Sequence, residues 1–160
     1  MKSTKKSYLI ILLIVQDQIS KVLISSNLAL GESLNLLPFL NFTLIHNTGI
    51  AFSLFDEGGN ISRWLLVIVV SAILVYLLFL MYKKTPKNWL ELMSLILISS
   101  GGLGNLVDRA FLGYVVDFVH VFYQDYSFYV FNMADSYITV GIILYPVSYT
   151  HLTLPTNREV

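Results

Sequence analysis

The chain has 160 residues, of which 56% are hydrophobic and 12% are charged, whereas soluble domains average about 45–50% apolar and about 25% charged residues. Lys plus Arg and Asp plus Glu number 10 each, so the net charge is zero, and no nucleic-acid partner is expected because its phosphates require a basic surface. Cysteine is absent, which excludes disulfides, thiolate nucleophiles and cysteine-bound metals. These values predict one compact domain embedded in a membrane.

Four apolar segments approach the length of about 20 residues with which a helix crosses the hydrocarbon layer. They predict transmembrane helices at about residues 7–26, 62–82, 88–107 and 128–147. The second contains WLLVIVVSAILVYLLFLMY, without charge, Gly or Pro, so a helix can satisfy every backbone group there. The expected fold is an all-α membrane protein, with a single domain over residues 1–147.

The connecting segments predict the orientation and a small β region. Three lysines precede the first helix and three more lie between the second and third, so the positive-inside rule predicts that both termini are cytoplasmic. The loop at about residues 27–62 contains the β-forming runs FTLI and IAFSLF, which predict a small extracytoplasmic β-rich region. Residues 148–160 turn polar, and we interpret them as an atypical tail that need not be native.

Two of the predicted helices contain polar groups with a defined spacing. Asp17 and Lys21 are four residues apart, so they share a helix face and can neutralise each other. The run GGLGNLVDRAF is not a phosphate-binding loop, because no strand precedes it and the Walker lysine is missing. Its small residues predict close helix packing, and Asn105, Asp108 and Arg109 predict a polar network at the outer end of the third helix.

The first loop supplies a further polar motif, HNTGIAFS. The amide of Asn47 can both donate and accept hydrogen bonds, and Gly49 permits a tight backbone path or the close approach of a substrate. An ordinary turn is the alternative interpretation. His46, His120 and Asp117 match no metal-ligand spacing, so no metal is expected.

Two carboxylates stand in apolar sequence on the same side of the predicted bilayer. Asp117 lies in YVVDFVHVF, and Asp135 is the single charge of the fourth helix, three residues after Asn132. Ionisable groups in membrane spans are costly and usually functional. Two carboxyl groups that share a low-dielectric site ionise one after the other, so one can act as base and the other as acid. Structural ion pairs of Asp117 with Arg109 and of Asp135 with Lys21 are the alternative.

The motifs DQISK, NTGIAFS, GGLGNLVDR, VVDF and FNMADSYI follow one another between Tyr8 and Ile143. In this order they resemble the lipoprotein signal peptidases, also called signal peptidase II. The resemblance implies an intramembrane aspartic endopeptidase of the bacterial cytoplasmic membrane, with four spans and an active site near the extracytoplasmic face. Such an enzyme cleaves the signal peptide of prolipoproteins immediately before the cysteine that carries a diacylglyceryl group.

The resemblance also assigns roles to particular residues. The catalytic pair would be Asp117 and Asp135. Residues that line or support the site would be Asn47, Gly49, Asn105, Asp108, Arg109, Asn132, Asp17 and Lys21. No cofactor is implied, and the expected partners are diacylglyceryl-prolipoproteins, membrane lipid and inhibitors of the globomycin type, with the protein acting as a monomer. The family would end in an apolar helix and a basic tail, from which SYTHLTLPTNREV departs.

Two other classes of protein remain as alternatives. A small proton- or cation-coupled transport or binding protein could use Asp17, Asp117 and Asp135 as an ion path, because buried acids also mark relays. A purely structural four-helix protein would need the two outer aspartates for stability alone.

Overall fold

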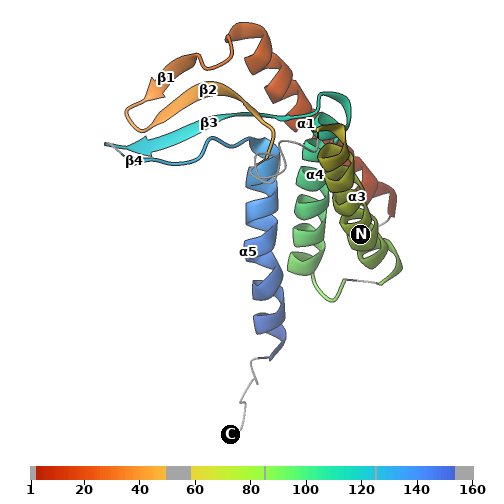
Figure 1. Ribbon diagram of the computed structural model, residues 1–160. Coiled ribbons are helices and arrows are strands. Elements are labelled where there is room, and N and C mark those ends of the chain that lie inside the picture. The colour runs from red at the N-terminus through yellow and green to blue at the C-terminus, as the bar shows by residue number, and fades with distance from the viewer. Residues whose placement is uncertain (1–2, 50–58, 85, 125, 154–160) are drawn as a thin grey trace, which may run out of the picture.

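The computed structural model describes residues 3–49, 59–84, 86–124 and 126–153 (Figure 1). The predicted β-forming run IAFSLF lies outside these ranges. In chain order, the helices and strands are α1 (Ser3–Asn27), β1 (Ser33–Leu37), β2 (Leu40–Asn47), α3 (Gly59–Lys83), α4 (Trp89–Phe111), β3 (Val115–Tyr123), β4 (Tyr126–Ser127) and α5 (Met133–Thr153). The structure is therefore mostly helical with one small sheet, as the sequence predicts.

Three helices in the described part of the chain are long and apolar enough to cross a membrane: α1, α3 from Ile61 onward, and α4. Their outward side chains are apolar; Ile68 and Val75 of α3, for example, are 63% and 67% exposed. A helix with a broad exposed apolar surface is typical of contact with lipid. Whether α5 forms a fourth span stays a prediction.

The predicted start of the last helix at residue 128 is wrong. Phe131 still pairs with Val119 of β3 through two backbone hydrogen bonds of 2.7 and 3.0 Å, so the chain is extended there, and α5 begins only at Met133. At its other end α5 continues past Pro146 into the expected polar tail, as far as Thr153. Ser148 is buried there, and its carbonyl accepts a 2.8 Å hydrogen bond from Asn88, a tertiary contact that the sequence pattern does not reveal.

The third helix also ends later than predicted, at Phe111 rather than residue 107. Arg63 of α3 donates hydrogen bonds of 2.8 and 2.6 Å to the carbonyls of Arg109 and Ala110. These carbonyls are among the last of α4 and have no partner within the helix. The side chain from α3 therefore stabilises the additional turn.

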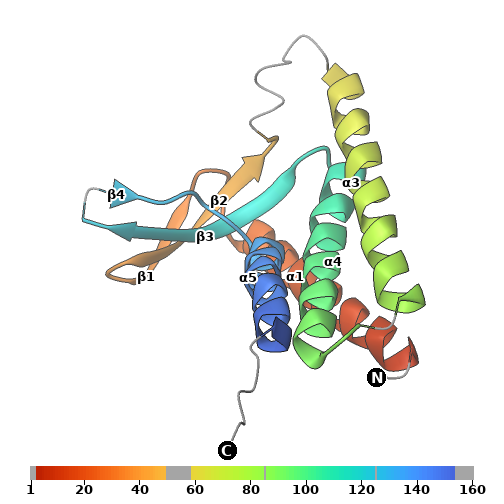
Figure 2. The same ribbon diagram turned by 90° about the horizontal axis from the view of Figure 1, so that it is seen from below.

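The four strands form one antiparallel sheet in the order β1-β2-β3-β4. It projects sideways from the end of the bundle at which α5 begins (Figures 1 and 2). In the pairing of β2 with β3, Ile45 lies opposite Asp117 and Asn47 opposite Val115. This register brings the end of β2 beside the start of β3.

Close packing of α4 against α5 fixes the relative height of these helices. A Cβ atom on Gly101 would lie only 2.2 Å from the carbonyl oxygen of Ala134, so only glycine allows this approach. The predicted packing role of the glycines is confirmed here. The contact places the first turn of α5 against the turn of α4 that runs from Gly101 to Asn105.

Candidate active site

Asp117 of β3 is 2% exposed, and both of its carboxylate oxygens accept hydrogen bonds from amides. Asn47 Nδ2 donates to Oδ2 at 2.8 Å, and Asn132 Nδ2 donates to Oδ1 at 2.6 Å. Three separate segments, β2, β3 and the start of α5, thus converge on one carboxyl group.

The side chain of Asn47 is oriented by a local turn. Its Oδ1 accepts a 2.8 Å hydrogen bond from the backbone N–H of Gly49, which leaves Nδ2 directed to Asp117. Gly49 has φ +88°, a conformation that is readily adopted only by glycine. The motif thus forms a turn, which was the alternative interpretation, and this turn directs the Asn47 amide to the Asp117 carboxylate.

Asp135 and Asn132 form a reciprocal cap at the start of α5. The backbone N–H of Asp135 donates to Asn132 Oδ1 at 2.9 Å, and the backbone N–H of Asn132 donates to Asp135 Oδ2 at 3.2 Å. This is the arrangement of a capping box, with both side chains satisfying free N–H groups of the first turn. The same cap fixes the position of the Asp135 carboxylate, which is only partly buried.

Asn105 of α4 connects the two aspartates to the rest of the interior. Its Nδ2 donates to Asp135 Oδ1 at 2.7 Å, and its Oδ1 accepts from Asn132 Nδ2 at 3.1 Å and from Lys21 Nζ at 3.0 Å. The polar network predicted at the end of the third helix, α4, is therefore present at Asn105. It extends to α1 through Lys21 and to the start of α5 through Asn132 and Asp135.

Lys21 lies between two carboxylates, at 2.8 Å from Asp17 Oδ2 and 2.9 Å from Asp108 Oδ2. The predicted pairing of Asp17 with Lys21 is confirmed. In the described residues Lys21 pairs with Asp17 and Asp108 rather than with Asp135, and no ion pair joins Arg109 to Asp117 there. Lys21 is 2% exposed, so it does not extend to the interface.

Asp17 and Asp108 also hold backbone groups of neighbouring elements. Asp17 Oδ1 accepts from the N–H of Ala134 in the first turn of α5 at 2.9 Å, and Asp108 Oδ2 accepts from the N–H of Val116 in β3 at 3.2 Å. An anionic group is favourable at a helix N-terminus. The buried cluster therefore positions the two segments that carry Asp135 and Asp117.

Two contributors were not identified from the sequence. Gln18 donates hydrogen bonds to Asp108 Oδ1 at 3.0 Å and to the carbonyl of Gly104 at 3.2 Å, which join α1 to α4. Arg63 of α3 is the other, and it stabilises the end of α4 through its hydrogen bonds to the carbonyls there. A polar residue beside Asp17 in an otherwise apolar helix was the available signal for Gln18; no local signal distinguished Arg63.

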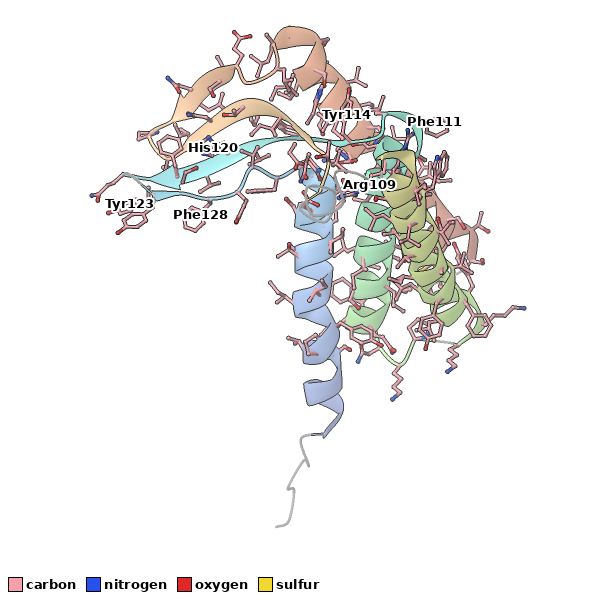
Figure 3. The ribbon with its side chains drawn as sticks, in the orientation of Figure 1. Arg109, Phe111, Tyr114, His120, Tyr123 and Phe128 are labelled. Atoms are coloured by element: carbon pink, nitrogen blue, oxygen red, sulfur yellow. The ribbon has the colours of Figure 1, made fainter. Side chains whose placement is uncertain are left out.

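Arg109 lies at the end of α4 near the start of β3 (Figure 3). It is partly buried, and its Nη1 lies 3.4 Å from the carbonyl of Asn105. Its Nε is buried and makes no hydrogen bond with the described part of the chain. Arg109 therefore adds positive charge near the aspartates.

A cavity of about 460 Å³ borders Asp135 and is otherwise lined by Phe131, Ser136, Thr139 and Val140. Its wall is mainly apolar. The partly buried carboxylate is thus accessible from this space, whereas Asp117 behind it is enclosed. A second cavity, of about 590 Å³, reaches Lys21 and Asp108 but is lined by neither Asp117 nor Asp135.

The environment of Asp117 changes its acidity. Burial raises its pKa from 3.8 to about 6, the hydrogen bond from Asn47 opposes this shift, and the charge of Asp135 adds to it. Burial disfavours the charged carboxylate because the surroundings solvate it less well than water does. Asp117 therefore exchanges its proton close to neutral pH, which suits acid–base catalysis.

The histidines do not assemble a metal site within the described ranges, which hold no group of three or more potential ligands. His46 stacks on Tyr114 with ring centroids 3.8 Å apart, and His120 hydrogen-bonds Ser127 at 2.7 Å. Both therefore have structural contacts in or beside the sheet.

The fold and site define a helical, multi-pass membrane protein. Two of its aspartates, Asp117 and Asp135, accept hydrogen bonds from the same residue, Asn132, at one end of the bundle. The family profile described as signal peptidase (SPase) II matches residues 9–150. The chain belongs to the signal peptidase II family.

Individual relatives agree with this assignment. The chain is 46% identical over 138 residues to the lipoprotein signal peptidase of Acinetobacter baylyi, covering 84% of this chain and 75% of that protein. The corresponding enzyme of Teredinibacter turnerae is 42% identical over 134 residues, covering 84% and 80%. A solved structure of a bacterial membrane enzyme is similar with a TM-score of 0.79 and 29% identity, over 96% of each chain.

Proposed function

We propose that this protein is an intramembrane aspartic endopeptidase that cleaves the signal peptide of diacylglyceryl-modified prolipoproteins immediately before the modified cysteine. Asp117 and Asp135 are the catalytic pair. The observation that carries the proposal is that Asn132 hydrogen-bonds both aspartates, while the nearby Lys21 is paired with Asp17 and Asp108 instead.

The charge of the interior favours a shared proton on this pair. Among the described residues at this end of the bundle, four aspartates, at positions 17, 108, 117 and 135, lie near two cations, Lys21 and Arg109. Two carboxylates of a coupled pair do not both ionise easily. One proton held by Asp117 and Asp135 together reduces the negative excess and supplies an acid and a base at once.

In the proposed reaction, the ionised carboxylate removes a proton from water as the water oxygen attacks the scissile carbonyl carbon. The protonated carboxyl donates to the carbonyl oxygen and stabilises the tetrahedral intermediate. The carbon–nitrogen bond then breaks, and the leaving nitrogen receives the proton that came from water. The amides of Asn47 and Asn105 hold the two carboxylates in place for these steps.

The substrate class follows from the position of the pair. Asp135 borders a mainly apolar cavity of about 460 Å³, which suits acyl chains entering from the bilayer. We place the pair near the extracytoplasmic face, with α5 as the fourth span and both termini cytoplasmic. A monomer contains every residue of this site, and globomycin-type peptides are expected to compete at it.

The experiment compares cleavage of a diacylglyceryl-modified prolipoprotein and its unmodified form by the purified protein in detergent. The wild type should cleave only the modified substrate. Asp117→Asn and Asp135→Asn should each abolish turnover, because an amide can neither accept the proton from water nor donate as a carboxylic acid does.

A control separates catalysis from stability. Asp108→Asn alters a carboxylate of the same interior that binds Lys21 rather than the reacting atoms, so it should lower thermal stability and leave measurable cleavage. Normal cleavage by either Asp117→Asn or Asp135→Asn would show that the pair is misassigned. Ion transport with no cleavage by a folded wild type would instead support the transporter alternative.

A further inference from the structure

A third cavity lies at the end of the helices opposite the aspartates. It has a volume of about 350 Å³ and is lined by residues of α3, of the α3–α4 connection, of α4 and of α5. The helix α4 begins beside it at Trp89, which precedes Asn105 by 16 residues, or about 24 Å along the helix. This is close to the hydrocarbon thickness of about 30 Å, so the two sites belong to opposite interfaces.

The described lining of this cavity carries more positive than negative charge. Lys84 and Lys87, both exposed, belong to it, and Glu91 is the one carboxylate among the described lining residues. Glu91 also accepts a hydrogen bond from the backbone N–H of Lys87, so its charge is partly used within the chain. The positive end of the α4 dipole lies here too, because α4 begins at Trp89. The site therefore suits one anionic group.

Polarity falls along the cavity from the connection toward the middle of the helices. Leu80 lies one turn before Lys84, and Leu95 lies one turn after Glu91 and is buried. Tyr76, one turn before Leu80, continues the wall along α3 with an aromatic ring and a hydroxyl that can donate. A phospholipid has the same gradient, from its charged headgroup to its acyl chains.

We propose that this cavity binds an anionic phospholipid of the adjoining leaflet. The phosphate lies between Lys84 and Lys87, and the first acyl carbons lie against Leu80 and Leu95. Basic pockets between transmembrane helices are known to select anionic headgroups. Inorganic phosphate would satisfy the lysines alone, so it should bind much more weakly than the lipid.

The test measures lipid retained by the purified full-length protein in detergent, using native mass spectrometry with phosphatidylglycerol and phosphatidylcholine of identical chains. The wild type should retain one phosphatidylglycerol in preference to phosphatidylcholine. Lys84→Gln with Lys87→Gln should weaken phosphatidylglycerol binding about fivefold for each lysine removed. The control, Lys5→Gln with Lys83→Gln, removes two exposed lysines that do not line the cavity and should bind as the wild type does.

A second variant tests the cavity without changing its charge. Leu80→Trp fills the apolar part and should expel the lipid although both lysines remain, which also decides the matter if the double lysine variant does not fold. Equal retention of the two lipids by the wild type would overturn the proposal. So would an equal loss in the control variant, or displacement of the lipid by an equal concentration of inorganic phosphate.

Discussion

Asn132 and Asp135 hydrogen-bond each other in both directions, each through its backbone N–H and the side chain of the other. The same two residues therefore begin α5 and fix one of the two proposed catalytic carboxylates. Asn132 also donates to Asp117. Helix capping and the geometry of the site consequently depend on one side chain.

Substituting Asn132 separates these two roles. Asn132→Ala should destabilise the protein by about 1 kcal/mol through loss of the cap and should abolish cleavage. Asn132→Ser can still cap α5, because serine is a good N-cap residue, but its hydroxyl is too short to replace the amide that reaches Asp117. It should unfold near the wild-type temperature and cleave poorly. Thermal unfolding and cleavage rates check this, and full activity of Asn132→Ser would contradict a role for the bridge.

The dependence of cleavage on pH should follow Asp117. Its pKa of about 6 predicts that kcat/KM falls as the pH is raised through about 6, because Asp117 then loses its proton and the pair loses its acid. Unfolding temperatures measured over the same pH range separate this effect from a change in stability. A folded pKa above the ordinary value of 3.8 means that its contribution to stability is fully present below about pH 4 and is lost as the pH rises through about 6.

Asn47→Ala provides a directed test of that assignment. The Asn47 amide favours the ionised form of Asp117, so its removal should raise the pKa of Asp117 and move the descending limb of the pH profile to higher pH. Thr48→Ala alters the neighbouring residue of the same turn and should leave the limb unchanged. An unchanged limb in Asn47→Ala would assign the titration to another group.

Lys21→Met should be among the most destabilising single substitutions in the interior. It leaves Asp17 and Asp108 buried without their cation, and breaking a buried ion pair typically costs about 3–5 kcal/mol. Adding Asp108→Asn to Lys21→Met should recover part of the loss, since one unpaired charge is then removed. Unfolding temperatures in detergent measure both effects; a Lys21→Met protein as stable as the wild type would contradict the importance of the cluster.

Two adjacent glycines of α4 should differ in their tolerance of alanine. Gly101→Ala places Cβ 2.2 Å from a backbone oxygen of α5, so the helices must separate, at a cost of about 1–3 kcal/mol or more. Gly102→Ala meets only the end of the Leu74 side chain, at 2.6 Å, which can rotate away, and alanine favours the helix by about 1 kcal/mol. Thermal unfolding of the two variants should therefore separate clearly, and equal stabilities would contradict the packing argument.

Features that depend on short distances along the chain could be predicted from the sequence. Apolar length gave the helices that could span a membrane, the four-residue spacing of Asp17 and Lys21 gave their ion pair, and the order of the short motifs gave the family. These results need only helical periodicity and the cost of charge in an apolar medium.

The remaining contacts could be identified only from the tertiary structure, because they join residues far apart in the chain. The sequence could not show that Lys21 takes Asp108 as a second partner, or that Asp17 accepts from Ala134, 117 residues away. The start of α5 at Met133 depends on the pairing of Phe131 with β3. Such contacts exist only when helix packing at residues such as Gly101 sets the relative heights of the elements, which no local pattern encodes.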